Sequence, residues 1–195
     1  MLRNTYAQDV RFAQPRAGNP DLIGEASKTE VHRPALAGDS SAFVDYTRGL
    51  KYVEQGQYVE AIEAFHNAIS RQPSFSLAYY QLGTLYMKQE QPGKAVSYYQ
   101  KALEDAPEFA DAHYGLASAY RELEEFGQAV AEYRKAIELV PDYAAAYQDL
   151  GVAYSEQKQY KAAIDAFQQA LKLLPKSPAP HYNLGLVYLK QGNFD

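Results

Sequence analysis

The chain is 195 residues long, which is enough for one domain or one short array of repeats. Its 19 basic and 24 acidic residues give a net charge of −5, the wrong sign for neutralising nucleic-acid phosphates. The absence of Cys excludes disulfide frameworks and thiol catalysis. No charge-free run approaches the ~18 apolar residues of a membrane-spanning helix. We therefore expect no nucleic-acid partner and no membrane insertion.

Residues 1–41 lack the periodicity of the rest of the chain. They contain three Pro, three Gly and equal numbers of acidic and basic side chains. This composition predicts a flexible tail or linker. A second interpretation rests on Leu2, Tyr6, Val10 and Ala13, whose near-helical spacing is compatible with a short helix that docks on another surface.

From residue 42 onward, six series of residues recur at steps of 34 positions. They are Pro73, Pro107, Pro141 and Pro175; Tyr52, Tyr86, Tyr120, Tyr154 and Tyr188; Gly49, Gly83, Ala117, Gly151 and Gly185; Ala61, Ala95, Ala129 and Ala163; Phe65, Tyr99, Tyr133 and Phe167; and Ala68, Ala102, Ala136 and Ala170. Six series in phase over four periods indicate a tandem repeat.

The spacing inside one unit, residues 76–109, predicts two helices. Small and aromatic residues recur at three- and four-residue steps before and after the break at residues 91–93, which is the stripe of an amphipathic helix in each half. Pro107 has no backbone N–H to donate and ends the second helix. Gly83 and Ala95 mark where the two helices approach most closely. One such pair cannot bury its own stripe, so the units must stack.

These residues resemble the tetratricopeptide repeat (TPR) family. The second unit carries the family pattern as Tyr79, Leu82, Gly83, Tyr86, Ala95, Tyr99 and Pro107, and the fourth as Tyr147, Leu150, Gly151, Tyr154, Ala163, Phe167 and Pro175. The resemblance covers residues 42–195, as units 42–75, 76–109, 110–143, 144–177 and a partial 178–195. It implies an all-α, right-handed superhelical solenoid of about four and a half repeats.

The two ends of the array depart from this pattern. Asp45 replaces the family's Trp and Arg48 its Leu, as expected of a polar first unit, and Ser40 and Ser41 are candidate N-caps. At the other end the fifth unit is incomplete, which favours a fragment of a longer protein. There we expect Leu184, Val187, Tyr188 and Leu189 to form an uncovered helix surface that self-associates or frays.

The sequence supports no catalytic, cofactor or metal site. It has no phosphate-binding glycine loop, no His-Glu-x-x-His and no Gly-x-Ser-x-Gly. Asp111 and His113 could be read as an acid–base pair, but His113 stands where the family has an aromatic packing residue. We interpret it as part of the core.

The resemblance implies a non-catalytic scaffold that binds a peptide or helix in a concave groove lined by the first helix of each unit. The expected groove residues are Tyr46, Tyr80, Tyr114, Gln148 and Tyr182; Leu50, Thr84, Ser118, Val152 and Leu186; and Met87 and Arg121. Chaperone-binding members hold a carboxylate with Lys, Arg and Asn. The corresponding Tyr46, Leu50, Gln81, Asp111 and Gly115 lack those groups, so this specificity is not implied.

The partner is expected to be a protein or peptide of unknown identity. Because Asp111, Glu122 and Glu156 outnumber Arg121 around the groove, its binding segment should be amphipathic and more basic than acidic. Two alternative roles stay open. The array could be the targeting or regulatory module of a larger enzyme, or it could belong to an assembly factor of an envelope or secretion machine.

Overall fold

The computed structural model describes residues 40–192, and within that range the chain forms nine α helices and no strands. The helices are α1 (Ser40–Glu54), α2 (Tyr58–Arg71), α3 (Ser76–Lys88), α4 (Pro92–Asp105), α5 (Ala110–Glu122), α6 (Phe126–Leu139), α7 (Ala144–Glu156), α8 (Tyr160–Leu173) and α9 (Pro178–Gln191). The predicted all-α fold is confirmed. Apart from Ser40 and Ser41, which begin α1, the segment predicted as a tail lies outside the described residues.

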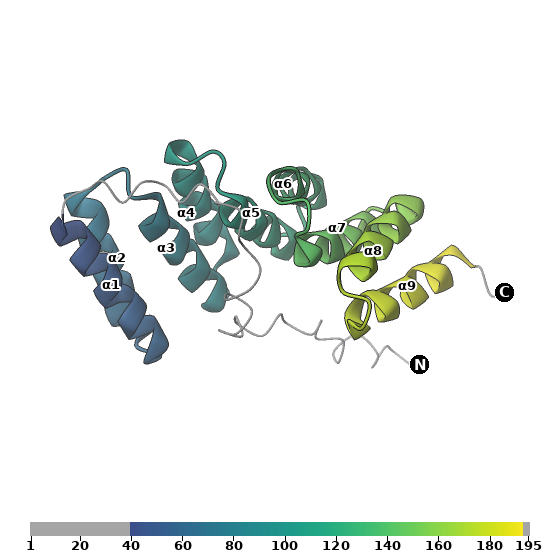
Figure 1. Cartoon of the computed structure of the whole chain (residues 1–195), viewed down its shortest axis with the longest axis horizontal. Helices are drawn as coiled ribbons and strands as arrows, with labels where there is room; N and C mark the ends of the chain where they lie inside the picture. Colours follow the sequence, from purple (N-terminus) through teal and green to yellow (C-terminus); the bar gives the residue numbers. More distant parts are fainter. Residues whose placement is uncertain (1–39, 193–195) are drawn as a thin grey trace, which may run out of the picture. The chain divides into compact units, whose positions relative to one another are not determined.

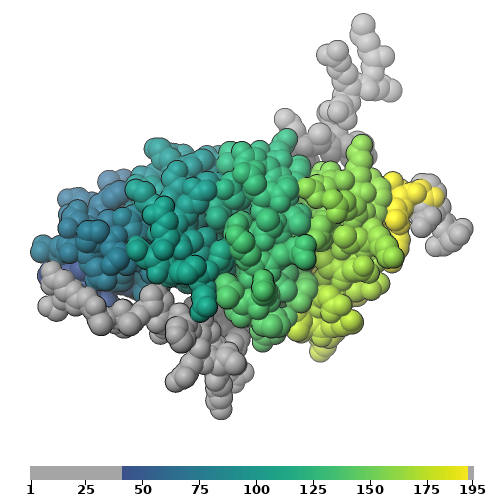
Figure 2. Space-filling model, turned by 90° about the horizontal axis from the view of Figure 1, so that it is seen from above, coloured from purple at the N-terminus to yellow at the C-terminus, as the bar shows by residue number. Residues whose placement is uncertain are grey.

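The helices pack in the order in which they follow one another along the chain. The pairs α1–α2, α3–α4, α5–α6 and α7–α8 lie side by side, and each second helix packs on the first helix of the next pair (Figure 1). In Figure 2 the pairs follow one another along the stack, with α9 at its far end. Four pairs and one single helix make the predicted four and a half units.

In the first, second and fourth units the two helices are held together by a ring packed against a glycine. A Cβ atom added to Gly83 would lie 2.7 Å from the ring of Tyr99, and one added to Gly151 would lie 2.6 Å from the ring of Phe167. Neither distance is possible for real atoms, so only glycine permits this approach. The small residues Ala95 and Ala163, which carry no exposed surface, complete the contact from the second helix.

Each first helix ends in the same turn, which the sequence analysis did not anticipate. Glu90, Glu124 and Lys158 have φ near +60°, at the repeat position that Gly56 and Gly192 also occupy with positive φ. In the middle units the next amide bonds back over five residues, as Gln91 N–H does to the Tyr86 carbonyl at 2.9 Å. This is the Schellman ending, in which the left-handed residue closes the helix.

The exposed surface of α9 differs in part from the prediction. Val187 is 1% exposed, because it packs against Val152 and Phe167 of the fourth unit, so its inclusion among the uncovered residues was wrong. Leu184 is partly buried against the same cluster. Tyr188 and Leu189 are exposed as predicted, at 40% and 57%, and Tyr182 adds a further 56%. Among the described residues no helix follows α9 to cover these side chains.

Ala129 and Ala131 of α6 provide a matched pair for testing the register. Ala129 has no exposed surface, whereas Ala131 faces solvent on the same helix. We expect Ala129→Leu to overpack the unit and lower the unfolding free energy by about 1–3 kcal/mol. Ala131→Leu should change it by less than about 0.5 kcal/mol. Urea denaturation measures both, and equal losses in the two variants would contradict the assigned register.

A second test compares Gly→Ala at two positions, one in a Schellman turn and one inside a helix, where the substitution should change stability in opposite directions. Gly56 has φ +74°, whereas Gly93 lies in the first turn of α4 with no atom near its missing Cβ. Gly56→Ala should destabilise the protein by about 1 kcal/mol, because a Cβ is strained in the left-handed region. Gly93→Ala should stabilise it by about 0.5 kcal/mol. Thermal melting checks both signs.

Candidate functional site

The first helices of the units form the inner face of the stack. α3 contacts α5, α5 contacts α7 and α7 contacts α9, whereas no second helix of the described array has a comparable contact with the next second helix. Helices that approach one another more closely lie on the inside of a curve. We call the surface formed by α1, α3, α5, α7 and α9 the concave face.

A ladder of aromatic rings, built from three groups of three rings, lies beneath this face. One repeat position holds Tyr46, Tyr80 and Tyr114 in the first three units, and each of these rings packs between two others. One of the two comes from the second helix of the same unit. The other belongs to the residue just before the first helix of the next unit. Between ring centroids, Tyr46 lies 5.7 Å from Phe65 and 5.0 Å from Phe75, Tyr80 lies 5.8 Å from Tyr99 and 4.9 Å from Phe109, and Tyr114 lies 5.7 Å from Tyr133 and 5.0 Å from Tyr143. In the fourth unit Gln148 and Ser177 take two of the three places, so the ladder ends there.

The ring hydroxyls are held by polar side chains of the first helices. The Tyr114 hydroxyl donates to Asp149 Oδ2 at 2.7 Å, and the Tyr143 hydroxyl donates to Asp111 Oδ1 at 3.0 Å. Tyr99 lies 3.3 Å from the Thr84 hydroxyl. Burial raises the pKa of Tyr99 to about 12, and burial with the neighbouring carboxylates raises the pKa of Tyr114 and Tyr143 further. These phenols are therefore neutral at physiological pH.

Arg121 is the one cation on the inner side of α5. Its Nη2 lies 3.0 Å from Glu122 Oε1, and its buried Nε has no hydrogen-bond partner among the described residues. Burial disfavours the charged guanidinium, but Tyr133, Asp149 and Glu122 outweigh it and raise the pKa of Arg121. Burial raises the pKa of Asp149, and Arg121 and Tyr114 only partly offset this.

The structure brings most of the predicted groove residues to the concave face, but to different depths. Tyr46 and Val152 are core residues, 8% and 7% exposed, because Tyr46 packs in the ladder and Val152 packs against Phe167. Tyr182 is exposed. The others are partly buried: Leu50, Tyr80, Thr84, Met87, Tyr114, Ser118, Arg121, Gln148 and Leu186.

His113 is a buried packing residue, as the sequence analysis interpreted it. Its Nδ1 lies 2.6 Å from Glu132 Oε2, and its Nε2 lies 2.8 Å from the Pro107 carbonyl oxygen. Burial raises the pKa of Glu132, but bonds from His113 and Lys135 outweigh it and lower the pKa below its ordinary value. The imidazole thus bonds to Glu132 rather than to Asp111. Within residues 40–192 no cluster of side chains could hold a metal ion.

The sequence analysis did not identify the ladder rings that directly precede the first helices. Phe75, Phe109 and Tyr143 keep the 34-residue step and immediately precede α3, α5 and α7. That series was available in the sequence as a signal. The pairing of Asp149 with Tyr114 could not be read from the sequence, because the two residues belong to different units.

Comparisons with known proteins agree with this architecture. Sequence models described as tetratricopeptide repeat or TPR repeat match residues 49–90, 80–144, 132–165 and 154–192. No curated protein gives a significant match. In the described part of the chain, no helix is long and apolar enough to span a membrane.

Solved structures share the fold. The crystal structure of MamA protein is 26% identical over 78% of this chain and 84% of that chain, with a TM-score of 0.75. YrrB, a TPR protein described as having an unusual peptide-binding site, is 22% identical over 79% of each chain, with a TM-score of 0.72. The first TPR of Spaghetti (RPAP3), bound to an HSP90 peptide, is 24% identical over 60% of this chain and 93% of that one, with a TM-score of 0.59. The predicted superhelical TPR fold is confirmed.

Asp149 gives a test of the polar layer under the concave face. Its pKa is raised in the native state, so the native state loses stability when Asp149 ionises, from about pH 4, the ordinary Asp value, upward through the raised pKa. Asp149→Asn removes this titration and keeps an acceptor for the Tyr114 hydroxyl. We expect the variant's stability relative to the parent to increase between about pH 4 and pH 7 in urea denaturation.

The control for this test is Asp165→Asn, at an exposed position of α8. Its stability relative to the parent should vary less with pH than that of Asp149→Asn. A stability difference for Asp149→Asn that stays constant across the range would contradict the buried, ionisable environment described for this carboxyl group.

Proposed function

The chain belongs to the tetratricopeptide repeat family, and from this we propose that it is a protein-interaction scaffold whose concave face binds a peptide or helix of a partner protein. Proteins of this family and fold are generally non-catalytic scaffolds. YrrB, with its peptide-binding site, and the first TPR of Spaghetti, bound to an HSP90 peptide, support the proposal. The fold alone does not define a ligand, so the partner must be argued from this chain's own side chains.

Packing in the aromatic ladder determines which side chains of the concave face remain accessible to a partner. The rings of Tyr80 and Tyr114 pack against neighbouring rings, so only part of each side chain is accessible to a partner. Tyr46 and Val152 are buried. Apolar contacts with a partner therefore fall mainly to Met87 and Leu186 and to their neighbours on the first helices, with polar contacts from Thr84, Ser118 and Gln148.

The charge of the face favours a basic partner segment. Glu122 is paired with Arg121, and Glu156 is paired with Lys190 at 3.0 Å. Asp111 is exposed, and among the described residues it bonds to a neutral hydroxyl and to no cation. Its uncompensated charge lies beside the Tyr80 and Tyr143 rings at the centre of the face. A Lys or Arg of the partner would complement it. This uncompensated carboxylate is the observation that supports the proposal most directly.

The proposal also covers the organisation of the chain. Residues 42–195 would form the interaction array, and residues 1–41 a tail that precedes it. The exposed Tyr182, Tyr188 and Leu189 of α9 support self-association through that end as a second mode of contact.

The test uses the full chain as bait and two variants with the same charge change in the third unit. Asp111→Lys alters the concave face, and Glu138→Lys alters an exposed position of α6. A partner-protein segment that is recovered with the parent chain is resynthesised as a peptide. This peptide should bind the Asp111→Lys variant at least about tenfold more weakly than it binds the parent, a loss of about 1.4 kcal/mol. Glu138→Lys should bind it within about twofold of the parent.

Hydrogen exchange gives the location independently of affinity. The bound segment should protect amides of α3, α5 and α7 more than those of α4, α6 and α8. Equal weakening by both variants, or protection restricted to the second helices, would refute binding at the concave face.

A further inference from the structure

The outer side of α1 presents a surface that is buried elsewhere in the array. Val44 and Arg48 occupy the positions that Ala78 and Leu82 occupy one repeat later in α3. Ala78 and Leu82 have no exposed surface, because α3 packs on α2 and both residues join the core that includes α2. Val44 is 52% exposed and the Arg48 side chain 51%. This side of α1 therefore has the position of a helix-packing surface, and no described helix covers it.

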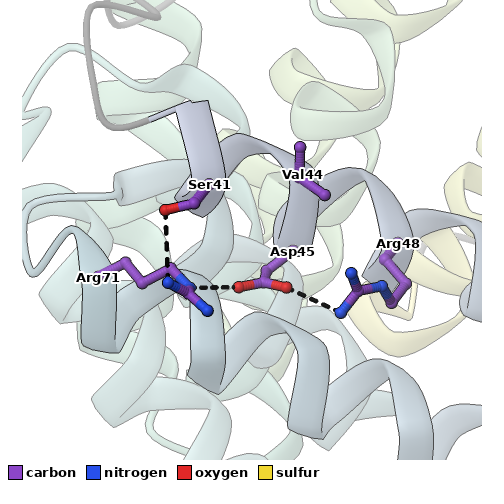
Figure 3. Close-up of a pocket in the computed structure, with 5 residues that line it drawn as sticks. All are labelled: Ser41, Val44, Asp45, Arg48 and Arg71. Carbon is purple, nitrogen blue, oxygen red and sulfur yellow. Dashed lines mark hydrogen bonds and ion pairs between the residues drawn. The ribbon is translucent and has the colours of Figure 1, made fainter.

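A hollow of about 360 Å³ lies at this surface, lined by Ser41, Val44, Asp45, Arg48 and Arg71. Figure 3 shows Asp45 between the two guanidinium groups, with Val44 above them. Asp45 Oδ1 accepts from Arg48 Nη1 at 2.9 Å, and Asp45 Oδ2 accepts from Arg71 Nε at 2.7 Å. Arg48 comes from α1 and Arg71 from the end of α2, so the packing of the first unit brings the three together.

The charges in this hollow do not balance. Asp45 is buried, with a side chain 7% exposed, and its single negative charge faces two guanidinium groups that are each about half exposed. A guanidinium carries five N–H donors, and Asp45 accepts one bond from each. Arg71 Nη1 also lies 3.5 Å from Ser41 Oγ. The rest of each fork remains available for another acceptor, and a carboxylate is the acceptor that fits this geometry best.

The shape of the surface indicates a helix rather than a free ion. In the next unit the corresponding positions are covered by α2, and at α1 the apolar side chain of Val44 lies beside the charged groups. We propose that this hollow is a second docking site, separate from the concave face, for an acidic amphipathic helix of a partner protein. An Asp or Glu of that helix pairs with Arg48 and Arg71, and an apolar residue beside it packs on Val44.

The experiment measures fluorescence anisotropy with the full chain and two probes. One probe is a labelled, stapled helical peptide with a Leu stripe flanked by Glu residues at i and i+4, and the other is its twin with Gln at both places. The Glu peptide should bind at least about tenfold more tightly than the Gln peptide, which corresponds to about 1.4 kcal/mol. Added salt should reduce this preference.

Arg48→Gln tests the site with little risk to folding, because Asp45 keeps Arg71 as its partner. This variant should bind the Glu peptide about as weakly as the Gln peptide, at an unchanged melting temperature. Arg134→Gln, at an exposed position of α6, is the matched control and should keep the full preference. Asp111→Lys should also keep it, which separates this site from the concave face.

Three results would overturn the proposal. The first is equal binding of both peptides by the parent chain. The second is a preference that survives in Arg48→Gln or disappears in Asp111→Lys. The third is no binding of either peptide together with faster proteolysis within residues 1–39 in Arg48→Gln, which would identify that segment of the chain, and not a partner, as the occupant of the hollow.

Discussion

The array depends on one contact, in which a ring from the second helix of a unit fills the space left by a missing side chain on the first helix. A Cβ atom on Gly49, Gly83 or Gly151 would come within 2.5–2.7 Å of that ring. In the third unit Ala117 replaces the glycine, and Gly115 instead admits the ring of Tyr99 from the unit before. Close approach of the two helices is thus obtained by removing side chains and then filling the space with large rings.

A second set of rings connects one unit to the next. Phe75, Phe109 and Tyr143 stand at helix N-caps, where Ser, Asp or Asn would normally bond the first amides, and none of them makes a side-chain cap. Each instead packs on the tyrosine of the preceding unit, and such ring pairs contribute roughly 0.5–1.5 kcal/mol. Stacking is favoured over capping at these positions. The concave face is left with hydroxyls, amides and carboxylates at its centre.

The first and last described helices differ in the chemistry of their outer surfaces. In α1 the packing positions hold Val44 and Arg48, and Arg48 pairs with the buried Asp45, so the surface is charged. In α9 the exposed positions hold Tyr182 and Leu189, so the surface is apolar. A surface with guanidinium groups favours a partner that carries a carboxylate, whereas an exposed apolar surface favours any partner that buries it. The two ends therefore differ in the kind of contact they can make.

The sequence alone determined the 34-residue period, the helix pairs and the close helix contact at Gly83 and Ala95, because these follow from spacing along one chain. It also placed His113 in the core. It did not determine the depth of Tyr46 and Val152, since the pattern names the face of a helix but not what packs over it. Only the tertiary structure decided that Tyr114 donates to Asp149, 35 residues away, and that Arg71 joins Arg48 on Asp45. Those pairs form between different helices, and their geometry exists only once the helices have packed.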